Sequence, residues 1–311
     1  MPSLQSIFFL IIYLVKSLKG NIDQRSYRAA HWDGLCSKGK RQSPIDLDIG
    51  RAIVMRWTPI QFHNYDVIGC VVASSNGHSE LAKEFRSSKK QPYITGGGLG
   101  GKYILQQFHF HWGGNDNSGS EHTLGRLHFP MEIHFVHILD GYNATTAMGV
   151  PETIAVVAVL LQVAKKGKAL MDLEKAFDNA NLTNSQTGTI GYNPHALLPK
   201  DTATFFRYEG SLTTPPCSEG VIWTVLAEPS YVSKQQLELI RHHLATDGRV
   251  LLHGWREIQP LHDRPIYLNK LKLLVSSVKV EDVAPVLCFL LITFTIILVS
   301  IHYMNFVDKI R

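Results

Sequence analysis

Two short histidine-bearing segments are the part of this chain most able to do chemistry. Residues 107–112 read QFHFHW and residues 132–137 read EIHFVH, and both are aromatic and apolar runs typical of β-strands. Because strand side chains alternate between faces, His109 and His111 share a face of the first segment, and His134 lies on one face of the second. If the strands are neighbours in one sheet, three imidazoles converge. Three histidines with one open position form the pattern of a catalytic zinc site.

The same alternation adds two candidate partners for these histidines. Gln107 and Glu132 each lie two residues before a histidine and on the same face, where they could accept a hydrogen bond from the ring nitrogen that does not bind metal. A single His-x-His is also compatible with half-exposed polar positions or a core histidine, so the zinc prediction depends on both strands. A cysteine-based zinc site lacks support, because the chain contains no C-x-x-C.

Length and composition predict one large domain with segments attached at its ends. The chain has 311 residues, of which 45% are hydrophobic and 18% charged. This suits a single domain of about 250 residues. The net charge is +5, and the basic residues are scattered. We therefore expect no nucleic-acid partner.

The two ends of the chain carry apolar runs of different length. Residues 1–20 contain a run too short to span a bilayer, which predicts a signal peptide, with an uncleaved anchor or a buried strand as alternatives. Residues 283–301 contain 19 residues without charge, long enough for a transmembrane helix. This organisation predicts a folded domain at 21–269, a juxtamembrane linker at 270–282 and a short cytoplasmic tail at 302–311.

The predicted transmembrane anchor has an alternative, and other residues indicate that the chain is exported. Small residues at 276–277 before the apolar tail also fit a GPI signal. In an exported chain, Cys36 and Cys217, both in polar loop-like surroundings, are the natural disulfide pair. The sequons at Asn143 and Asn181 predict glycosylation sites and agree with export.

The secondary-structure pattern predicts a β-rich α+β fold in a single domain. Short alternating strands separated by Gly, Pro and Asn turns dominate, and helical spacing is convincing at only two places. The expected strands include 58–62, 67–74, 103–112, 131–139, 154–163 and 221–226; the expected helices are 169–180 and 233–243, with Ser233 as a possible N-cap.

Several longer motifs occur in a fixed order along the chain. They are QSPIDL at 42–47, FHFHWG at 108–113, SEHT at 120–123, EIHFVH at 132–137 and GSLTTPP at 210–216. Together they resemble the α-class carbonic anhydrases, and the match extends from about residue 27 to residue 267. The resemblance implies a large, mostly antiparallel, twisted central β-sheet with a few peripheral helices and zinc in a conical cavity. It also implies reversible hydration of carbon dioxide to bicarbonate and a proton.

The resemblance assigns roles position by position. His109, His111 and His134 match the zinc ligands. Thr213 matches the hydroxyl that orients the attacking hydroxide, and Glu121 matches the carboxylate that accepts the threonine proton and leaves its oxygen free to accept. The apolar wall that receives carbon dioxide matches Val136, Val156, Leu212, Val221 and Trp223, and Thr214 belongs to the same expected substrate pocket.

Three further positions follow from the same comparison. His78 matches the histidine that relays a proton to bulk water, although Asn76-Gly77 before it is also a hairpin signal that would make it a turn residue. We interpret His137, on the opposite strand face from His134, as structural, and we expect His122 to tie strands together. Cys36 and Cys217 fit the disulfide of exported family members.

These observations predict a membrane-anchored zinc lyase whose catalytic domain lies outside the cell, attached by a single transmembrane segment. A second hypothesis keeps the same fold as a catalytically weak ligand-binding ectodomain; such a protein would be expected to lack a zinc histidine, and all three are present. A third, a zinc peptidase, lacks the H-E-x-x-H motif.

Overall fold

The structure of the protein is a computed structural model. It describes residues 32–75, 80–83, 90–167, 169–171, 173–174, 189–242 and 250–270. The chain divides into two units, Met1–Lys270 and Leu271–Arg311, and every described residue belongs to the first. None of the helices in these ranges has the length and apolarity needed to cross a membrane. The predicted signal peptide at 1–20, transmembrane segment at 283–301 and tail at 302–311 lie outside the described residues, as does the predicted linker at 270–282 except for its first residue.

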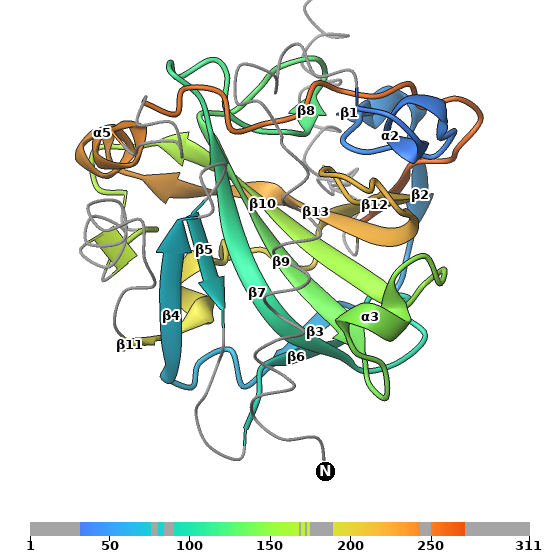
Figure 1. Ribbon diagram of the computed structural model, residues 1–311, viewed down its shortest axis with the longest axis horizontal. Coiled ribbons are helices and arrows are strands. Elements are labelled where there is room, and N and C mark those ends of the chain that lie inside the picture. Colours follow the sequence, from blue (N-terminus) through green and yellow to red (C-terminus); the bar gives the residue numbers. More distant parts are fainter. Residues whose placement is uncertain are drawn as a thin grey trace, which may run out of the picture. The chain divides into compact units, whose positions relative to one another are not determined.

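A large twisted sheet organises the first unit (Figure 1). Its strand order is β11-β4-β5-β7-β9-β10-β13-β12-β14-β2, and β6 pairs with both β3 and β7. Only the β10–β13 and β14–β2 pairs in this sheet are parallel. The predicted mostly antiparallel sheet is therefore confirmed. The strands are β2 (Ile53–Met55), β3 (Ile60–His63), β4 (Gly69–Ser75), β5 (Glu80–Lys83), β6 (Tyr93–Gly96), β7 (Tyr103–Trp112), β9 (Met131–Leu139), β10 (Ile154–Val163), β11 (Thr189–Tyr192), β12 (Phe205–Ser211), β13 (Glu219–Val232) and β14 (Tyr267–Asn269).

Short elements lie around this sheet. A separate pair joins β1 (Asp46–Leu47) and β8 (Thr123–Leu124) in parallel. The helices are α2 (Leu35–Lys38), η2 (Ile49–Arg51), α3 (Ala144–Ala147), η3 (Pro194–Leu197) and α5 (Lys234–Arg241). Ser233 caps α5 as predicted, because its hydroxyl accepts from the amide of Gln236 in a capping box. The helix predicted at 169–180 lies mostly outside the described residues.

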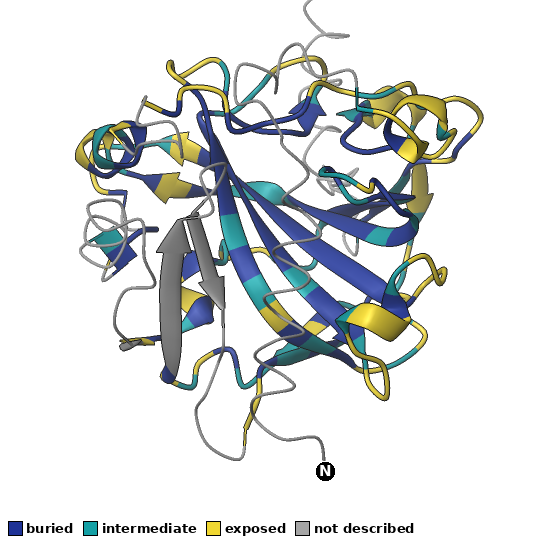
Figure 2. Ribbon diagram, in the orientation of Figure 1, coloured by how far each residue is buried: buried dark blue, intermediate teal, exposed yellow. Residues whose placement is uncertain are grey.

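The central strands are buried on both faces (Figure 2). Along β10, Val157 and Val159 belong to one apolar cluster, whereas Val156 and Ala158 belong to a second on the other face. The second cluster lies on the same face of the sheet as His134, because Ala158 pairs directly with it. Strand alternation therefore separates an aromatic core from the face that carries the histidines.

A β-bulge sets which face the histidines occupy. The pairing of β7 with β9 shifts register between Leu105 and Gln107, so Gln106 is an extra residue. Tyr103 and Leu105 consequently share the aromatic core with the even-numbered Phe108. Uninterrupted alternation along 103–112 would have placed Tyr103 and Leu105 on the histidine face, so only the part of the strand after the bulge follows the expected phase.

Strand β13 is longer than the predicted 221–226 and continues through Pro229 to Val232. Proline cannot donate to a sheet ladder and usually ends a central strand. Here the β10–β13 register shifts, so that Val159 pairs with Leu226 and Leu161 with Ser230. The irregularity accommodates the proline, and pairing resumes beyond it. The predicted 58–62 and 67–74 strands begin later than expected, at Ile60 and Gly69, whereas 103–112, 131–139 and 154–163 have the predicted bounds.

Candidate metal and active site

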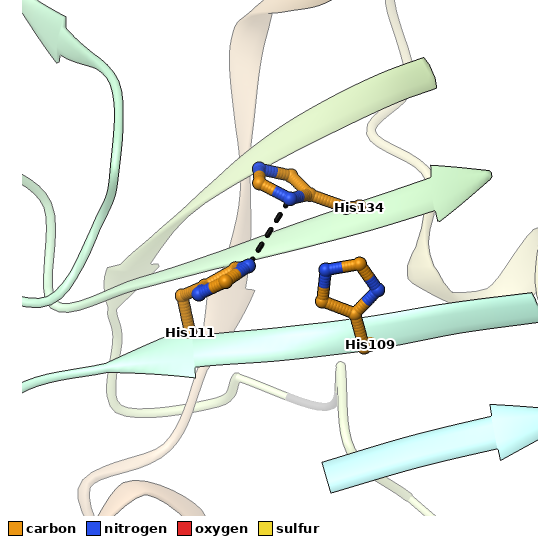
Figure 3. Close-up of side chains that lie close together, drawn as sticks. All are labelled: His109, His111 and His134. Atoms are coloured by element: carbon orange, nitrogen blue, oxygen red, sulfur yellow. Dashed lines mark hydrogen bonds between the residues drawn. The ribbon is translucent and has the colours of Figure 1, made fainter. Parts of the chain in front are cut away.

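Three imidazoles converge on one face of the β7–β9 pair (Figure 3). His109 and His134 are directly opposite each other in the antiparallel register, and His111 follows two residues along β7. One ring nitrogen from each residue lies within 4.8 Å of those of the other two. His111 and His134 are each only 1% exposed, and His109 is half-buried. The convergence predicted from strand spacing is present.

The second nitrogen of each ring is held by an acceptor. Nδ1 of His109 donates to Oε1 of Gln107 (2.8 Å), and Nε2 of His134 donates to Oε1 of Glu132 (2.7 Å). Both acceptors were expected from the sequence. The third is the backbone oxygen of Gly254, which accepts from Nδ1 of His111 at 2.6 Å. A carbonyl 143 residues along the chain leaves no signal in the sequence around His111.

These contacts determine which nitrogens can bind a metal. A neutral imidazole carries one proton, and the acceptors place it on Nδ1 of His109, Nδ1 of His111 and Nε2 of His134. The unprotonated nitrogens are then Nε2 of His109, Nε2 of His111 and Nδ1 of His134, and they face one another. Nε2 of His111 lies 3.1 Å from Nδ1 of His134. Tetrahedral zinc with Zn–N bonds of about 2.0–2.1 Å separates its ligand nitrogens by about 3.3 Å, so the residues fit this ion.

Burial favours the neutral form of two of the three histidines. It lowers the pKa of His109 well below the usual histidine value and lowers that of His134, and the neighbouring imidazoles add to the effect. For Glu132, burial alone would raise the pKa, but the electrostatic interactions with the His122 and His134 rings and the hydrogen bonds from them outweigh it and hold the pKa well below the usual value. Glu132 is therefore a carboxylate that supports the proton on His134.

A buried polar chain extends behind Glu132. Oε1 of Glu132 also accepts from Nδ1 of His122 (2.6 Å), and Nε2 of His122 contacts the hydroxyl of Tyr208 (2.7 Å). That hydroxyl donates to Oγ of Ser43 at 2.8 Å. His122 thus ties β9 to β12, as expected, whereas Tyr208 and Ser43 were not anticipated. A second group of possible metal ligands consists of His122, Glu132 and His134. The hydrogen bonds from the two histidine rings, however, already occupy the carboxylate of Glu132.

Glu121 lies next to the triad and is wholly buried. Its Oε1 accepts from the backbone amide of Arg256 at 2.9 Å. Its Oε2 has no hydrogen-bond partner among the described residues and lies 3.9 Å from Nδ1 of His134. Thr213, just after β12, is 6% exposed, and the structure does not pair it with Glu121 Oε2. The carboxylate therefore presents an unused acceptor in a buried site.

The predicted apolar wall forms one row across neighbouring strands. Val136 on β9 pairs with Val156 on β10, which pairs with Trp223 on β13. The Trp223 ring centroid lies 4.8 Å from that of His134. Val221 belongs to the same apolar cluster, and Leu212 packs against it. Thr214 is half-buried in the loop after β12, where its carbonyl accepts from the amide of Cys217.

The remaining predicted residues have different outcomes. Cys36 and Cys217 form a disulfide, as expected. His137 is fully buried and hydrogen-bonds the Tyr65 hydroxyl, which fits its interpretation as structural. Asn143 is the N-cap of α3, and its Oδ1 accepts from two amides. His78 and Asn181 lie outside the described residues.

The fold and the triad define a class: a β-sheet protein in which three converging histidines could hold a metal ion. A family model described as eukaryotic-type carbonic anhydrase matches residues 27–270. The chain belongs to this family. Its members in general hydrate carbon dioxide and depend on zinc.

Individual relatives agree with this assignment. "Putative carbonic anhydrase 5" of Caenorhabditis elegans is 42% identical over 255 residues, covering 78% of this chain and 79% of that protein. "Putative carbonic anhydrase 3" of the same organism is 45% identical over 237 residues, covering 73% and 89%. "Carbonic anhydrase 7" of Homo sapiens is 35% identical over 250 residues, covering 76% and 92%.

Proposed function

We propose that this protein catalyses the reversible hydration of carbon dioxide with zinc held by His109, His111 and His134. One observation carries the proposal: three unprotonated ring nitrogens converge, while each opposite nitrogen is committed to an acceptor. Three buried lone pairs that face one another are unfavourable unless a cation lies between them. The donor set, three neutral imidazoles, is also the one that catalytic zinc uses in carbonic anhydrase.

Zinc, when bound, lowers the pKa of water and so makes hydroxide available near neutral pH. Carbonic anhydrases are the standard example, and we propose that zinc has the same effect in this protein. The protein must then orient that hydroxide. We assign this to Thr213 and Glu121. The buried, unpartnered Oε2 of Glu121 is suited to accept the Thr213 proton, which leaves the threonine oxygen as an acceptor for the hydroxide.

Carbon dioxide is apolar and needs an apolar place beside the triad. The row formed by Val136, Val156 and Trp223 provides it, with Val221 and Leu212 in the same cluster. We assign Thr214 to its border. His109 is the most exposed of the three histidines. The proton released in each turnover leaves through His78.

The test measures hydration and metal together. The purified full-length chain should contain about one zinc and accelerate carbon dioxide hydration in a stopped-flow indicator assay. Removal of zinc by a chelator should abolish the activity, and zinc should restore it. A zinc-loaded, folded protein that leaves the hydration rate at its uncatalysed value would favour the ligand-binding alternative.

We further propose that the catalytic domain lies outside the cell. The disulfide supports this, because such bonds persist in oxidising compartments. Residues 1–20 act as the signal peptide, 283–301 as a transmembrane anchor, and Asn143 and Asn181 as glycosylation sites. Phosphatidylinositol-specific phospholipase C applied to intact cells should leave the enzyme and a C-terminal tag attached. Release of tag-free enzyme would instead establish a GPI anchor.

A further inference from the structure

A three-residue segment contacts the candidate site twice through its backbone. The oxygen of Gly254 accepts from Nδ1 of His111 (2.6 Å), and the amide of Arg256 donates to Oε1 of Glu121 (2.9 Å). The segment belongs to the irregular stretch between α5 and β14. Its first residue is held against the end of β7, because His253 bridges to Gly113 and the amide of Gly254 donates to the carbonyl of Trp112 (3.3 Å). Arg256 lies beyond this bridge and outside every helix and strand, so other contacts must determine where that end of the segment lies.

The side chain of Arg256 supplies such contacts. It is 5% exposed, and its guanidinium donates to three neutral oxygens from the distant N-terminal part of the domain. Nη2 donates to the carbonyl of Cys36 (2.8 Å); Nη1 donates to Oε1 of Gln42 (3.0 Å) and to the carbonyl of Ser43 (2.7 Å). The guanidinium also lies over the ring of Trp32, 5.3 Å from its centroid.

We infer that Arg256 is a positioning residue for the metal site. Its guanidinium fixes the end of residues 254–256 that lies beyond the bridge to β7, so that the Arg256 amide orients Glu121 and the Gly254 carbonyl keeps its place against His111. Its catalytic consequence rests on the proposed function; its structural consequence does not. The fork geometry explains the residue type, because a planar guanidinium reaches three oxygens that a single ammonium cannot satisfy together. Glu121, held through Oε1, then keeps Oε2 beside the triad.

Arg256→Lys is the variant that tests this, and Arg264→Lys is its matched control. Arg264 is equally buried at 6% exposed, and its guanidinium also donates to backbone oxygens, including those of Gln42 (2.9 Å) and Glu209 (3.0 Å). Among the described contacts it has none with Gly254 or Glu121; its guanidinium lies over the ring of Tyr208, 5.7 Å from the centroid, but does not hydrogen-bond the Tyr208 hydroxyl that contacts His122. Both changes remove a buried fork, but only one should alter the metal site.

Two readouts separate positioning from general destabilisation, both on the full-length chain. Chelator competition should show zinc affinity lowered roughly 10- to 100-fold in Arg256→Lys, the usual effect of losing a group that orients a ligand, and nearly unchanged in Arg264→Lys. The visible spectrum of the cobalt-substituted protein should change only in Arg256→Lys. Equal affinities and spectra in the two variants would overturn the inference.

If Arg256→Lys does not fold, amide hydrogen exchange in the wild-type protein tests the inference instead. Adding zinc to the metal-free protein should slow amide exchange in residues 251–258 and in 36–43, as well as in β7 and β9. Protection confined to β7 and β9 would overturn the inference. If zinc affinity falls in Arg256→Lys but not in Arg264→Lys, and the wild-type protein does not hydrate carbon dioxide, only the proposed function is refuted. If the wild-type protein hydrates carbon dioxide but the two variants have the same zinc affinity and spectrum, only this inference is refuted.

Discussion

The carboxylate of Glu132 holds the ring of His134 from the nitrogen that faces away from the triad, at 2.7 Å, and both side chains are almost wholly shielded from solvent. The direction of this hydrogen bond leaves Nδ1 as the nitrogen of His134 that is free to bind a metal, whereas in His109 and His111 the free nitrogen is Nε2. A metal site on a strand pair therefore depends on acceptors as much as on its ligands.

Glu132→Gln should weaken zinc binding by roughly 10- to 100-fold while preserving the fold. The amide keeps the shape of the side chain but loses the charge that favours the proton on Nε2 of His134. Competition with a zinc chelator measures the effect. Gln107→Glu offers a comparison in the opposite direction, with binding at least as tight as in the wild type. Unchanged affinity in Glu132→Gln would show that the carboxylate does not support the ligand.

His134→Ala should lose most of the metal and all measurable hydration, because a neutral ligand is removed from a three-ligand site. Zinc analysis and stopped-flow hydration check both effects. His195→Ala is the matched control, since that histidine is exposed in η3 and distant in sequence from the triad. Full zinc content and activity in His134→Ala would contradict the assignment of the site.

His137 should make the protein less stable as the pH falls. Burial lowers its pKa to about 3, well below that of an unfolded histidine. Between the unfolded pKa of about 6.5 and the folded value, unfolding takes up a proton, so stability present above about pH 6.5 declines as the pH falls, by at most about 1.4 kcal/mol per pH unit.

Urea unfolding at pH 7 and pH 5 measures this contribution. His137→Gln can still donate to the carbonyl of Ala155 but cannot titrate. The difference in unfolding free energy between the two pH values should therefore be smaller in the variant. The same pH dependence in both proteins would assign the acid sensitivity to other groups.

His78→Ala should lower turnover in weak buffer and leave carbon dioxide–bicarbonate exchange nearly unchanged, because only proton export is affected. Added imidazole should restore turnover by carrying the proton itself. Turnover in dilute buffer that equals the wild-type value would show that His78 is a turn residue without a catalytic role.

Much of the fold and site could be predicted because it depends on local periodicity. Alternation along 107–112 and 132–137 placed the three histidines and two of their acceptors on one face, and the strand pairing brought them together. The disulfide was also accessible, since few cysteines compete for the pairing. Two features could not be predicted: the bulge at Gln106 and the continuation of β13 through Pro229. Each depends on the register of a partner strand.

The sequence alone determined the ligand residues and the face on which they lie, because strand geometry has a period of two residues whatever surrounds it. Only the tertiary structure decided which nitrogen of His111 is free and where Glu121 lies. Gly254 and Arg256 set both through backbone groups, and a backbone carbonyl or amide is the same in every residue except proline's missing N–H. Sequence cannot distinguish such groups; only the folded chain brings the right one to the site.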